Sequence, residues 1–212
     1  MGSPIEKDLE SLLKYIKPSM FIVETGTGVS TKIICKKLSK YNNKDTNFSS
    51  IDYVPTEHFD KSIHNHHKNL RLNYNFLNLY SGWSISYNDI IKKGEDLFVE
   101  SRYKDVIDGE IAKGNRNLMT GEVDLIRKIV KKENRKIDFF FCDTGEYCGI
   151  AEWRVANPLI KKGGIFAIHD ILHPKSIKGF QVVKMIEKSE NWKVLEKRID
   201  SPQGLLIARK NK

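Results

Sequence analysis

The 212-residue sequence is poor in cysteine and lacks any long apolar segment, and both absences narrow what the protein can be. No apolar run approaches the ~18 residues that span a bilayer, so no membrane span is predicted. Charged side chains break up the start of the chain, which excludes the apolar core of a signal peptide. The three cysteines are odd in number and form no C-x-x-C pair: Cys35, Cys142 and Cys148. We therefore expect a reduced, cytoplasmic protein whose cysteines act as small buried hydrophobic residues.

Acidic residues are outnumbered, and the formal net charge is +9. This charge suits an anionic partner such as nucleic acid, a phosphorylated sugar or a nucleotide. The densest basic cluster lies mostly off an apolar helical pattern, so we interpret it as a solvated helix face. Its members are Arg127, Lys128, Lys131, Lys132, Arg135 and Lys136.

Short apolar segments alternate with helical patterns along most of the chain. Strands are predicted at residues 20–24, 48–52, 76–80, 137–142, 165–169, 192–197 and 205–209. Helices are predicted at residues 9–16, 30–40, from about 85, 150–160 and 180–188, with a turn at Gly163 and Gly164. This alternation indicates an α/β fold, a mostly parallel sheet with helices on both faces. The last two strands are joined too closely for a crossover helix, so the final strand should be antiparallel.

Residues 1–212 are predicted to form a single domain. The regular alternation is interrupted at about residues 94–121, where an insertion of this length is typical of a lid or binding loop. The first three residues, Met1-Gly2-Ser3, resemble a cloning remnant, which leaves open that the domain was cut from a larger protein.

The stretch "FIVETGTGVSTKII" places a G-x-G loop between a strand and a helix. Such a loop lets backbone N–H groups approach an anionic or nucleotide-like ligand. Glu24 ends the first strand, and Asp52 ends the second, where an acid can bind both hydroxyls of a ribose. Ser30 and Thr31 stand where the dinucleotide fingerprint has its third glycine, so a dehydrogenase fits less well. The Gly-Lys-Ser/Thr of a P-loop is absent.

These residues resemble a known family. "VETGTGVST" is similar to the first motif of class I S-adenosylmethionine (SAM)-dependent methyltransferases, and five further landmarks follow in the family's order: "SIDY", "SGWS", "IDFFFCDTGEY", "KKGGIFAIHDI" and "GLLIARK". The resemblance covers nearly the whole chain apart from the insertion. It implies a Rossmann-like methyltransferase fold with a seven-stranded sheet, and SAM as the cofactor.

The resemblance also implies a role for individual residues. Gly26 and Gly28 would line the methionine and ribose parts of SAM, Glu24 would lie near the methionyl amine, and Asp52 would hold the ribose hydroxyls. Trp83 departs from the family's usual acid or amide, and it is either a platform for adenine or a core aromatic. The implied cofactor-binding set is Glu24, Gly26, Gly28, Ser30, Thr31, Asp52, Tyr53, Trp83, Ser84 and Asp143.

Two acids, Asp143 and Asp170, follow the fourth and fifth strands, where ligands bind in an open parallel sheet. Taken alone, such acids are often helix caps or solvated carboxylates. The pair resembles the metal-binding acids of catechol-type and macrolide-sugar O-methyltransferases. That implies a magnesium or manganese ion held by Asp143 and Asp170, which would lower the pKa of a substrate hydroxyl and position it for transfer.

The pattern departs from those relatives at the base. They often read D-x-x-H after the fourth strand, whereas Glu146 holds the histidine's place here. The catalytic base is therefore open between Glu146, His169 and His173, with Asp143 beside them, and the metal is open for the same reason. Four histidines after the second strand lack regular ligand spacing and are interpreted as a surface cluster: His58, His64, His66 and His67.

The acceptor is the least determined feature. The [DNS]-P-P-[YFW] signature is absent, which lowers the odds of adenine or glutamine N-methylation. One hypothesis is an O-methyltransferase for a sugar, glycan or other small molecule, with Trp83, Tyr147 and Trp153 near the cleft mouth. A second is a metal-independent RNA ribose O-methyltransferase with a lysine base, Lys175 or Lys178, which fits the positive charge. A third is a protein that binds SAM without catalysis, against which the intact loop and acids argue.

Overall fold

The computed structural model describes residues 4–41, 45–52, 69–70, 73–90, 122–145, 148–172, 177–201 and 203–212. Within these residues a seven-stranded sheet has the order β3-β2-β1-β4-β5-β7-β6. The strands are β1 (Phe21–Thr25), β2 (Asn47–Asp52), β3 (Leu77–Ser81), β4 (Ile137–Cys142), β5 (Ile160–His169), β6 (Trp192–Arg198) and β7 (Leu205–Lys210).

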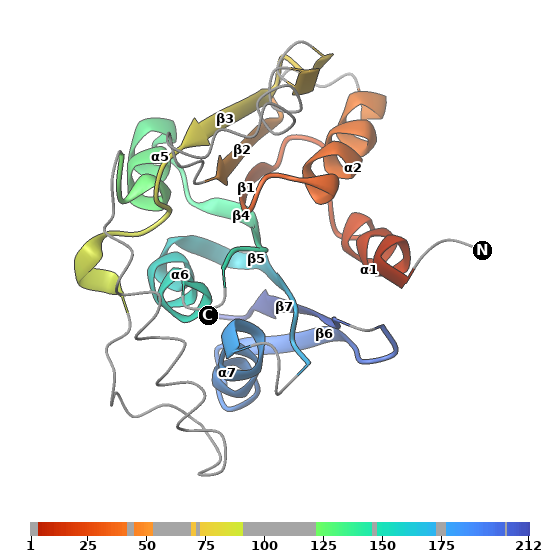
Figure 1. Ribbon diagram of the computed structural model, residues 1–212, viewed down its shortest axis with the longest axis vertical. Coiled ribbons are helices and arrows are strands. Elements are labelled where there is room, and N and C mark those ends of the chain that lie inside the picture. The colour runs from red at the N-terminus through yellow and green to blue at the C-terminus, as the bar shows by residue number, and fades with distance from the viewer. Residues whose placement is uncertain are drawn as a thin grey trace.

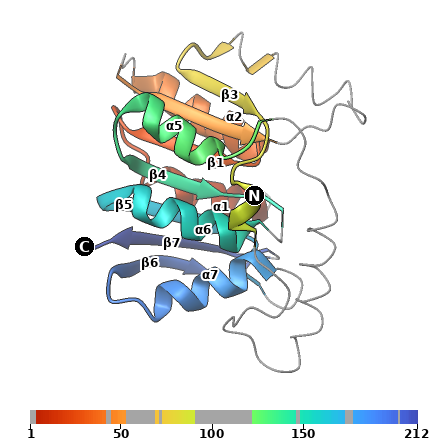
Figure 2. The same cartoon turned by 90° about the vertical axis from the view of Figure 1, so that its left-hand side faces the viewer.

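The direction of the strands confirms the predicted topology. β1 pairs in parallel with β2 and β4, β2 with β3, and β4 with β5. β7 is antiparallel to both of its neighbours, β5 and β6, so among these seven strands it alone runs backwards. In Figure 2 its arrow points opposite to those of β3 and β4.

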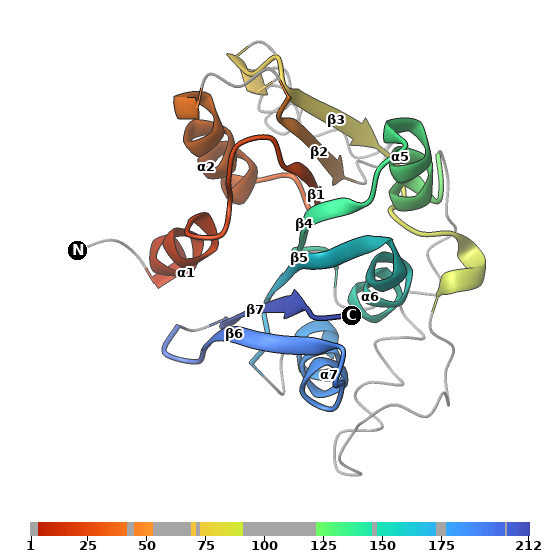
Figure 3. The ribbon, with the colours of Figure 1, turned by 180° about the vertical axis from the view of Figure 1, so that it is seen from behind.

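Helices cover both faces of the sheet. α1 (Pro4–Leu13) and α2 (Val29–Leu38) lie on one face, and α5 (Leu125–Glu133), α6 (Gly149–Ala156) and α7 (Ile177–Glu187) lie on the other (Figures 1 and 3). In the described part of the chain three short 3-10 helices connect elements: η1 (Ser39–Tyr41), η3 (Tyr87–Asp89) and η5 (Asn157–Leu159). None of the helices described is both long and apolar enough to cross a membrane.

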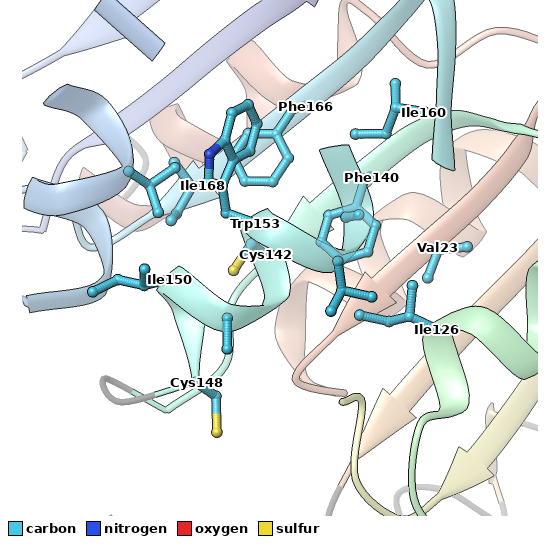
Figure 4. Packing of buried hydrophobic residues seen from close by; sticks show 14 of the residues in the cluster. Val23, Ile126, Phe140, Cys142, Cys148, Ile150, Trp153, Ile160, Phe166 and Ile168 are labelled. Carbon is cyan, nitrogen blue, oxygen red and sulfur yellow. The ribbon is translucent and has the colours of Figure 1, made fainter. Parts of the chain in front are cut away.

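The strand "IDFFFC" explains how the sheet joins two cores. Successive side chains of a strand point to opposite faces. Phe139 and Phe141 therefore pack with α1 and α2, whereas Phe140 and Cys142 pack with α5, α6 and α7 (Figure 4). All four side chains are fully buried. A fifth residue, Asp138, accepts a 2.7 Å hydrogen bond from the backbone N–H of Phe21 and so helps to fix β1 against β4.

Two local predictions are wrong, and a third is only partly tested. Gly163 and Gly164 do not form a turn before β5, because they lie inside it, where the register with β4 slips between Ile160 and Ile165. The helix expected from about Ile85 is described only as the short helix η3, which follows the buried Ile85, because residues 91–121 lie outside the described part of the chain. Trp153 does not lie at a cleft mouth, because its ring packs 4.7 Å from that of Phe166 within the core (Figure 4).

Of the remaining sequence features, the cysteines and the basic cluster lie within the described residues, and the insertion and the histidine cluster do not. The three cysteines are free and buried, as predicted. The six residues of the basic cluster on and after α5 are all exposed, which supports a solvated helix face. The insertion at about 94–121 and the histidine cluster lie outside the described residues, so their interpretation stays a prediction.

Candidate active site

A cavity of about 260 Å³ lies at the carboxyl ends of the central strands. Its lining combines residues that end or follow β1, β2, β3 and β4 with two residues from the start of α6: Thr25, Gly26, Ile51, Asp52, Gly82, Trp83, Ser84, Asp143, Thr144, Gly145, Cys148 and Glu152. The volume is just below the usual ~300–1,000 Å³ of ligand pockets. Ligands of open α/β sheets bind at this edge, so the cavity is the candidate cofactor site.

Gly26 brings the glycine loop against the end of β4. Its φ is +88°, and a Cβ at this position would lie 2.1 Å from the backbone oxygen of Asp143. Its N–H donates a 2.9 Å hydrogen bond to the Ile51 carbonyl, and the Asp143 N–H donates one of 3.0 Å to the Thr25 carbonyl. Only glycine allows this approach, because a side chain would meet both strain and a backbone atom. Gly28 is different, since a Cβ there would meet open space.

Glu24 is fully buried beneath this loop and does not line the cavity. Its carboxyl oxygens accept hydrogen bonds from the hydroxyls of Ser30 (2.6 Å), Thr31 (2.6 Å) and Ser50 (2.8 Å). Burial raises the pKa of Glu24 to about 7, although the three hydroxyl groups act in the opposite direction. The structure thus places Glu24, Ser30 and Thr31 in the support of the loop, and the predicted contact of Glu24 with a methionyl amine stays untested.

Asp52, Trp83 and Ser84 line the cavity from the β2 and β3 side. The carbonyl of Asp52 accepts a 3.0 Å hydrogen bond from the N–H of Gly82, which joins the ends of these two strands. Trp83 is only 5% exposed and belongs to the hydrophobic core, yet it also forms part of the cavity wall. The two interpretations of Trp83, as a core residue and as a ligand platform, are therefore compatible.

Glu152 is a cavity residue that sequence reasoning missed. It is fully buried on α6 and accepts hydrogen bonds from Thr25 (2.7 Å), from the thiol of Cys142 (3.3 Å) and from the Ser84 hydroxyl. Burial raises its pKa, against the effect of these hydrogen bonds. Seven of the eight residues of α6 are buried. An acid in so apolar a helix is the signal that could have identified it.

Beside the cavity, Asp143 and Asp170 come together as predicted, because β4 and β5 are neighbours. His169 Nδ1 lies 3.6 Å from Asp143 Oδ1 and 3.5 Å from Asp170 Oδ1. Lys178, from α7, places its Nζ 2.8 Å from Asp170 Oδ2 and 3.5 Å from Asp143 Oδ1. We call these four residues the acid cluster. The exposed fraction of the side chain is 29% for Asp143 but only 9% for His169 and 2% for Lys178, so Asp143 faces the cleft.

A third acid, Asp8, lies on the other side of His169. Asp8, on α1, is 1% exposed, and its Oδ2 lies 3.6 Å from His169 Nε2. Its Oδ1 lies 3.2 Å from the Nε of Arg198. Burial alone would lower the pKa of His169, but the surrounding carboxylates of Asp143, Asp170 and Asp8 outweigh it, and the pKa is raised. Sequence reasoning missed Asp8, whose only signal is an acid next to the apolar residues Leu9 and Leu12 of α1.

Five site candidates named from the sequence lie outside the described residues. They are the base candidates Glu146 and His173, the cofactor candidate Tyr53, the aromatic Tyr147 and the RNA-type lysine candidate Lys175. Their roles stay predictions.

Comparison with known proteins places this arrangement among solved methyltransferase structures. No protein-family model and no curated protein matches the chain. An O-methyltransferase from Bacillus cereus in complex with SAH matches with a TM-score of 0.60 and 13% identity, over 100% of this chain and 83% of that one. The O-methyltransferase TomG from Streptomyces achromogenes, in complex with SAM, matches with 0.56 and 13%, over 100% and 82%. An rRNA methylase from Streptococcus thermophilus matches with 0.54 and 11%, over 100% and 99%.

The chain has the Rossmann-like methyltransferase fold. Identities of 11–13% establish the fold alone, so the activity has to be argued from the site. The site fits the cofactor of this fold. Gly26, whose lack of a Cβ lets the loop close against Asp143, lines the cavity together with Asp52.

The acid cluster fits a divalent ion less well. Asp143, His169 and Asp170 offer ligand atoms that all lie within 4.8 Å of one another, as a metal site requires. The Lys178 Nζ lies among the same carboxylates, however, and donates a 2.6 Å hydrogen bond to the Thr144 carbonyl. Burial alone would lower the pKa of Lys178, but Asp143 and Asp170 outweigh it and raise the pKa, so the group is an ammonium ion. A cation, the Lys178 ammonium, therefore already lies among the ligand atoms that a metal ion would use.

Proposed function

We propose that the protein is a SAM-dependent O-methyltransferase. The observation that carries this proposal is the position of Asp143, which lines the cavity and also belongs to the acid cluster. A cofactor site and a group of acid–base residues thus share one residue. A protein that only binds SAM would not need Asp143, His169 and Asp170 to converge beside the cofactor.

One group of residues would bind the cofactor, and a second would accept the proton of the acceptor hydroxyl. Gly26 and the Gly82–Ser84 turn would bind the cofactor, with the Asp52 carboxylate on the ribose hydroxyls. The bound cofactor supplies an activated methyl group on a sulfonium, so the protein mainly has to position the acceptor. Asp143, the most exposed member of the acid cluster, accepts a hydrogen bond from the acceptor hydroxyl. That hydroxyl becomes acidic as it is methylated, and its proton passes to the Asp143–His169 pair.

For the acceptor we favour a sugar, glycan or other small molecule. Support comes from the similarity of the Asp143–Asp170 arrangement to small-molecule O-methyltransferases and from the match to TomG, an O-methyltransferase involved in tomaymycin synthesis. Aromatic residues give less support for a sugar acceptor than the sequence suggested. Trp153 is buried in the core and, of the aromatic residues described, only Trp83 lines the cavity. We retain the prediction of a single domain in a reducing, cytoplasmic setting as part of this proposal.

A second candidate, RNA ribose O-methylation, is favoured by the net charge of +9 and by the rRNA methylase match over the whole chain. The position of Lys178 argues against its lysine-base mechanism. The lysine is 2% exposed and hydrogen-bonded inside the acid cluster, so its ammonium is neither deprotonated nor accessible to a ribose.

Calorimetry with SAM tests the proposal. We expect micromolar binding to the wild type, and about 10- to 100-fold weaker binding for Asp52→Ala, because hydrogen bonds to a charged group contribute about 1.5–3 kcal/mol. Glu190→Ala is the matched control, since it removes an exposed acid at the junction of α7 and β6 and should leave binding unchanged. Absence of SAM binding by the wild type would refute the proposal.

The acceptor class needs a separate assay. Transfer of a labelled methyl group would be measured to sugar and catechol hydroxyls and, in parallel, to short RNA. Labelling of the small hydroxyl compounds alone supports the first candidate, and labelling of RNA alone supports the second. Substitution of Asp143 by Asn should reduce either activity more than it reduces SAM affinity, since its carboxylate belongs to the acid cluster as well as to the cofactor cavity.

A further inference from the structure

Lys178 is built into the acid cluster by the packing of two helices. A Cβ on Gly149, at the start of α6, would lie 2.3 Å from the Cβ of Lys178, so the absence of a side chain there lets the lysine stem pass. A Cβ on Gly179 would lie 2.1 Å from the backbone oxygen of Asp170, so α7 can approach the end of β5 only because residue 179 is glycine. Both close approaches serve to bring the ammonium to the carboxylates.

The ammonium contacts three oxygen atoms at that position. It contacts the Thr144 carbonyl at 2.6 Å, Asp170 Oδ2 at 2.8 Å and Asp143 Oδ1 at 3.5 Å. A lysine ammonium has three donors, and a buried charge is retained only when it is paired in this way. These contacts hold Lys178 where a cation bound between the two acids would be.

Lys178 already neutralises part of the charge of the acid cluster. Its ammonium faces the carboxylates of Asp143 and Asp170, whereas Arg198, beside Asp8, also pairs with Asp200 and so is not a counter-charge for the cluster alone. A divalent ion bound between Asp143 and Asp170 would lie within a few ångströms of the ammonium, and the repulsion between the two cations opposes its binding.

We propose that the ammonium group of Lys178 is the resident cation of the Asp143–Asp170 pair, which it orients and neutralises in place of a divalent metal ion. One consequence for catalysis is that methyl transfer proceeds without added metal, and this consequence rests on the proposed function. The assignment of the cation itself rests on the contacts above. Lys178 is accordingly a positioning residue that holds Asp143 toward the acceptor.

Manganese binding, measured by calorimetry and by the electron paramagnetic resonance signal of free Mn²⁺, tests this assignment in the 212-residue protein. We expect no binding at sub-millimolar Mn²⁺ for the wild type. Lys178→Met removes the charge but keeps most of the stem, and we expect it to bind Mn²⁺ on the order of 100-fold more tightly than the wild type, because the repulsion between the two cations is lost. Lys178→Gln, whose amide can still donate to the Thr144 carbonyl, provides a second neutral variant if the first does not fold.

Two controls separate charge from structure. Lys178→Arg keeps the positive charge and should not gain Mn²⁺ binding. Lys184→Met removes another lysine of α7, one whose Nζ lies 5.7 Å from the centroid of the Phe180 ring, and should behave as the wild type. Sub-millimolar Mn²⁺ binding by the wild type, or no gain in either neutral variant, would overturn the proposal. Failure of the wild type to bind SAM would instead count against the proposed function, so the two failures are distinguishable.

Discussion

The substitution Gly26→Ala tests the geometry on which the cofactor site depends. The added Cβ would lie 2.1 Å from the Asp143 backbone oxygen and 2.9 Å from its carbon, and the residue would keep a φ of +88°. A residue in such a strained conformation costs about 1–3 kcal/mol, and relieving the overlap by backbone movement adds a comparable amount. We therefore expect a loss of about 2–6 kcal/mol in the free energy of unfolding.

This loss can be measured by thermal denaturation and by SAM calorimetry. For a domain of this size each kcal/mol lowers the melting temperature by about 2–4 °C, so a decrease of about 4–24 °C is expected. SAM affinity should fall at least about tenfold, because the atom that has to move belongs to Asp143, which lines the cavity.

Gly28→Ala is the matched control in the same loop. Gly28 has an extended φ of −168°, and its added Cβ would meet no atom within 4 Å. We expect the melting temperature and the SAM affinity to stay close to those of the wild type. If Gly26→Ala behaved like Gly28→Ala in both assays, the close approach of the loop to β4 would be refuted.

Two further predictions concern buried acids. The folded-state pKa of Glu24, about 7, exceeds its ordinary value of 4.5. Between these two pH values the folded protein therefore holds a proton that the unfolded chain releases. The free energy of unfolding should fall by about 3 kcal/mol as pH rises from 4.5 to 7. Chemical denaturation across this range should show that component in the wild type but not in Glu24→Gln, and equal pH slopes would contradict it. Glu152→Ala leaves three buried donors, on Thr25, Ser84 and Cys142, without their acceptor. It should lower the free energy of unfolding by about 3–5 kcal/mol and weaken SAM binding. Ser84→Ala removes one of these donors, and an equal loss in both variants would argue against the shared network.

The sequence predicted the parts of the fold that depend on local pattern. The alternation of strands and helices and the short link between the last two strands were enough to predict the order of elements and the reversed β7. The juxtaposition of Asp143 and Asp170 was also predictable, because parallel neighbours end at the same edge. Gly163 and Gly164 misled the prediction, since a pair of glycines is typical of a turn but here allows β5 to slip in register against β4.

The partners of the buried charged groups were not predictable. Lys178 is distant in sequence from Asp143, and its role depends on how α7 packs on α6, which no local pattern encodes. Glu24 was expected to face a ligand, yet its oxygens are bonded to three hydroxyls, of which Ser50 comes from β2. Asp8 and Glu152 are single acids in apolar helices, and only the tertiary structure shows which groups face them.

The adjacency of β1 and β4 also bears on how the protein folds. The bond between Phe21 and Asp138 spans 117 positions of the chain, and the cavity is completed only when these two central strands pair. Contacts so distant in sequence raise the contact order and slow folding, because a long loop must close before they form. Ligand binding therefore requires this long-range pairing, and during synthesis the nascent chain can bind its cofactor only after β4 has emerged from the ribosome.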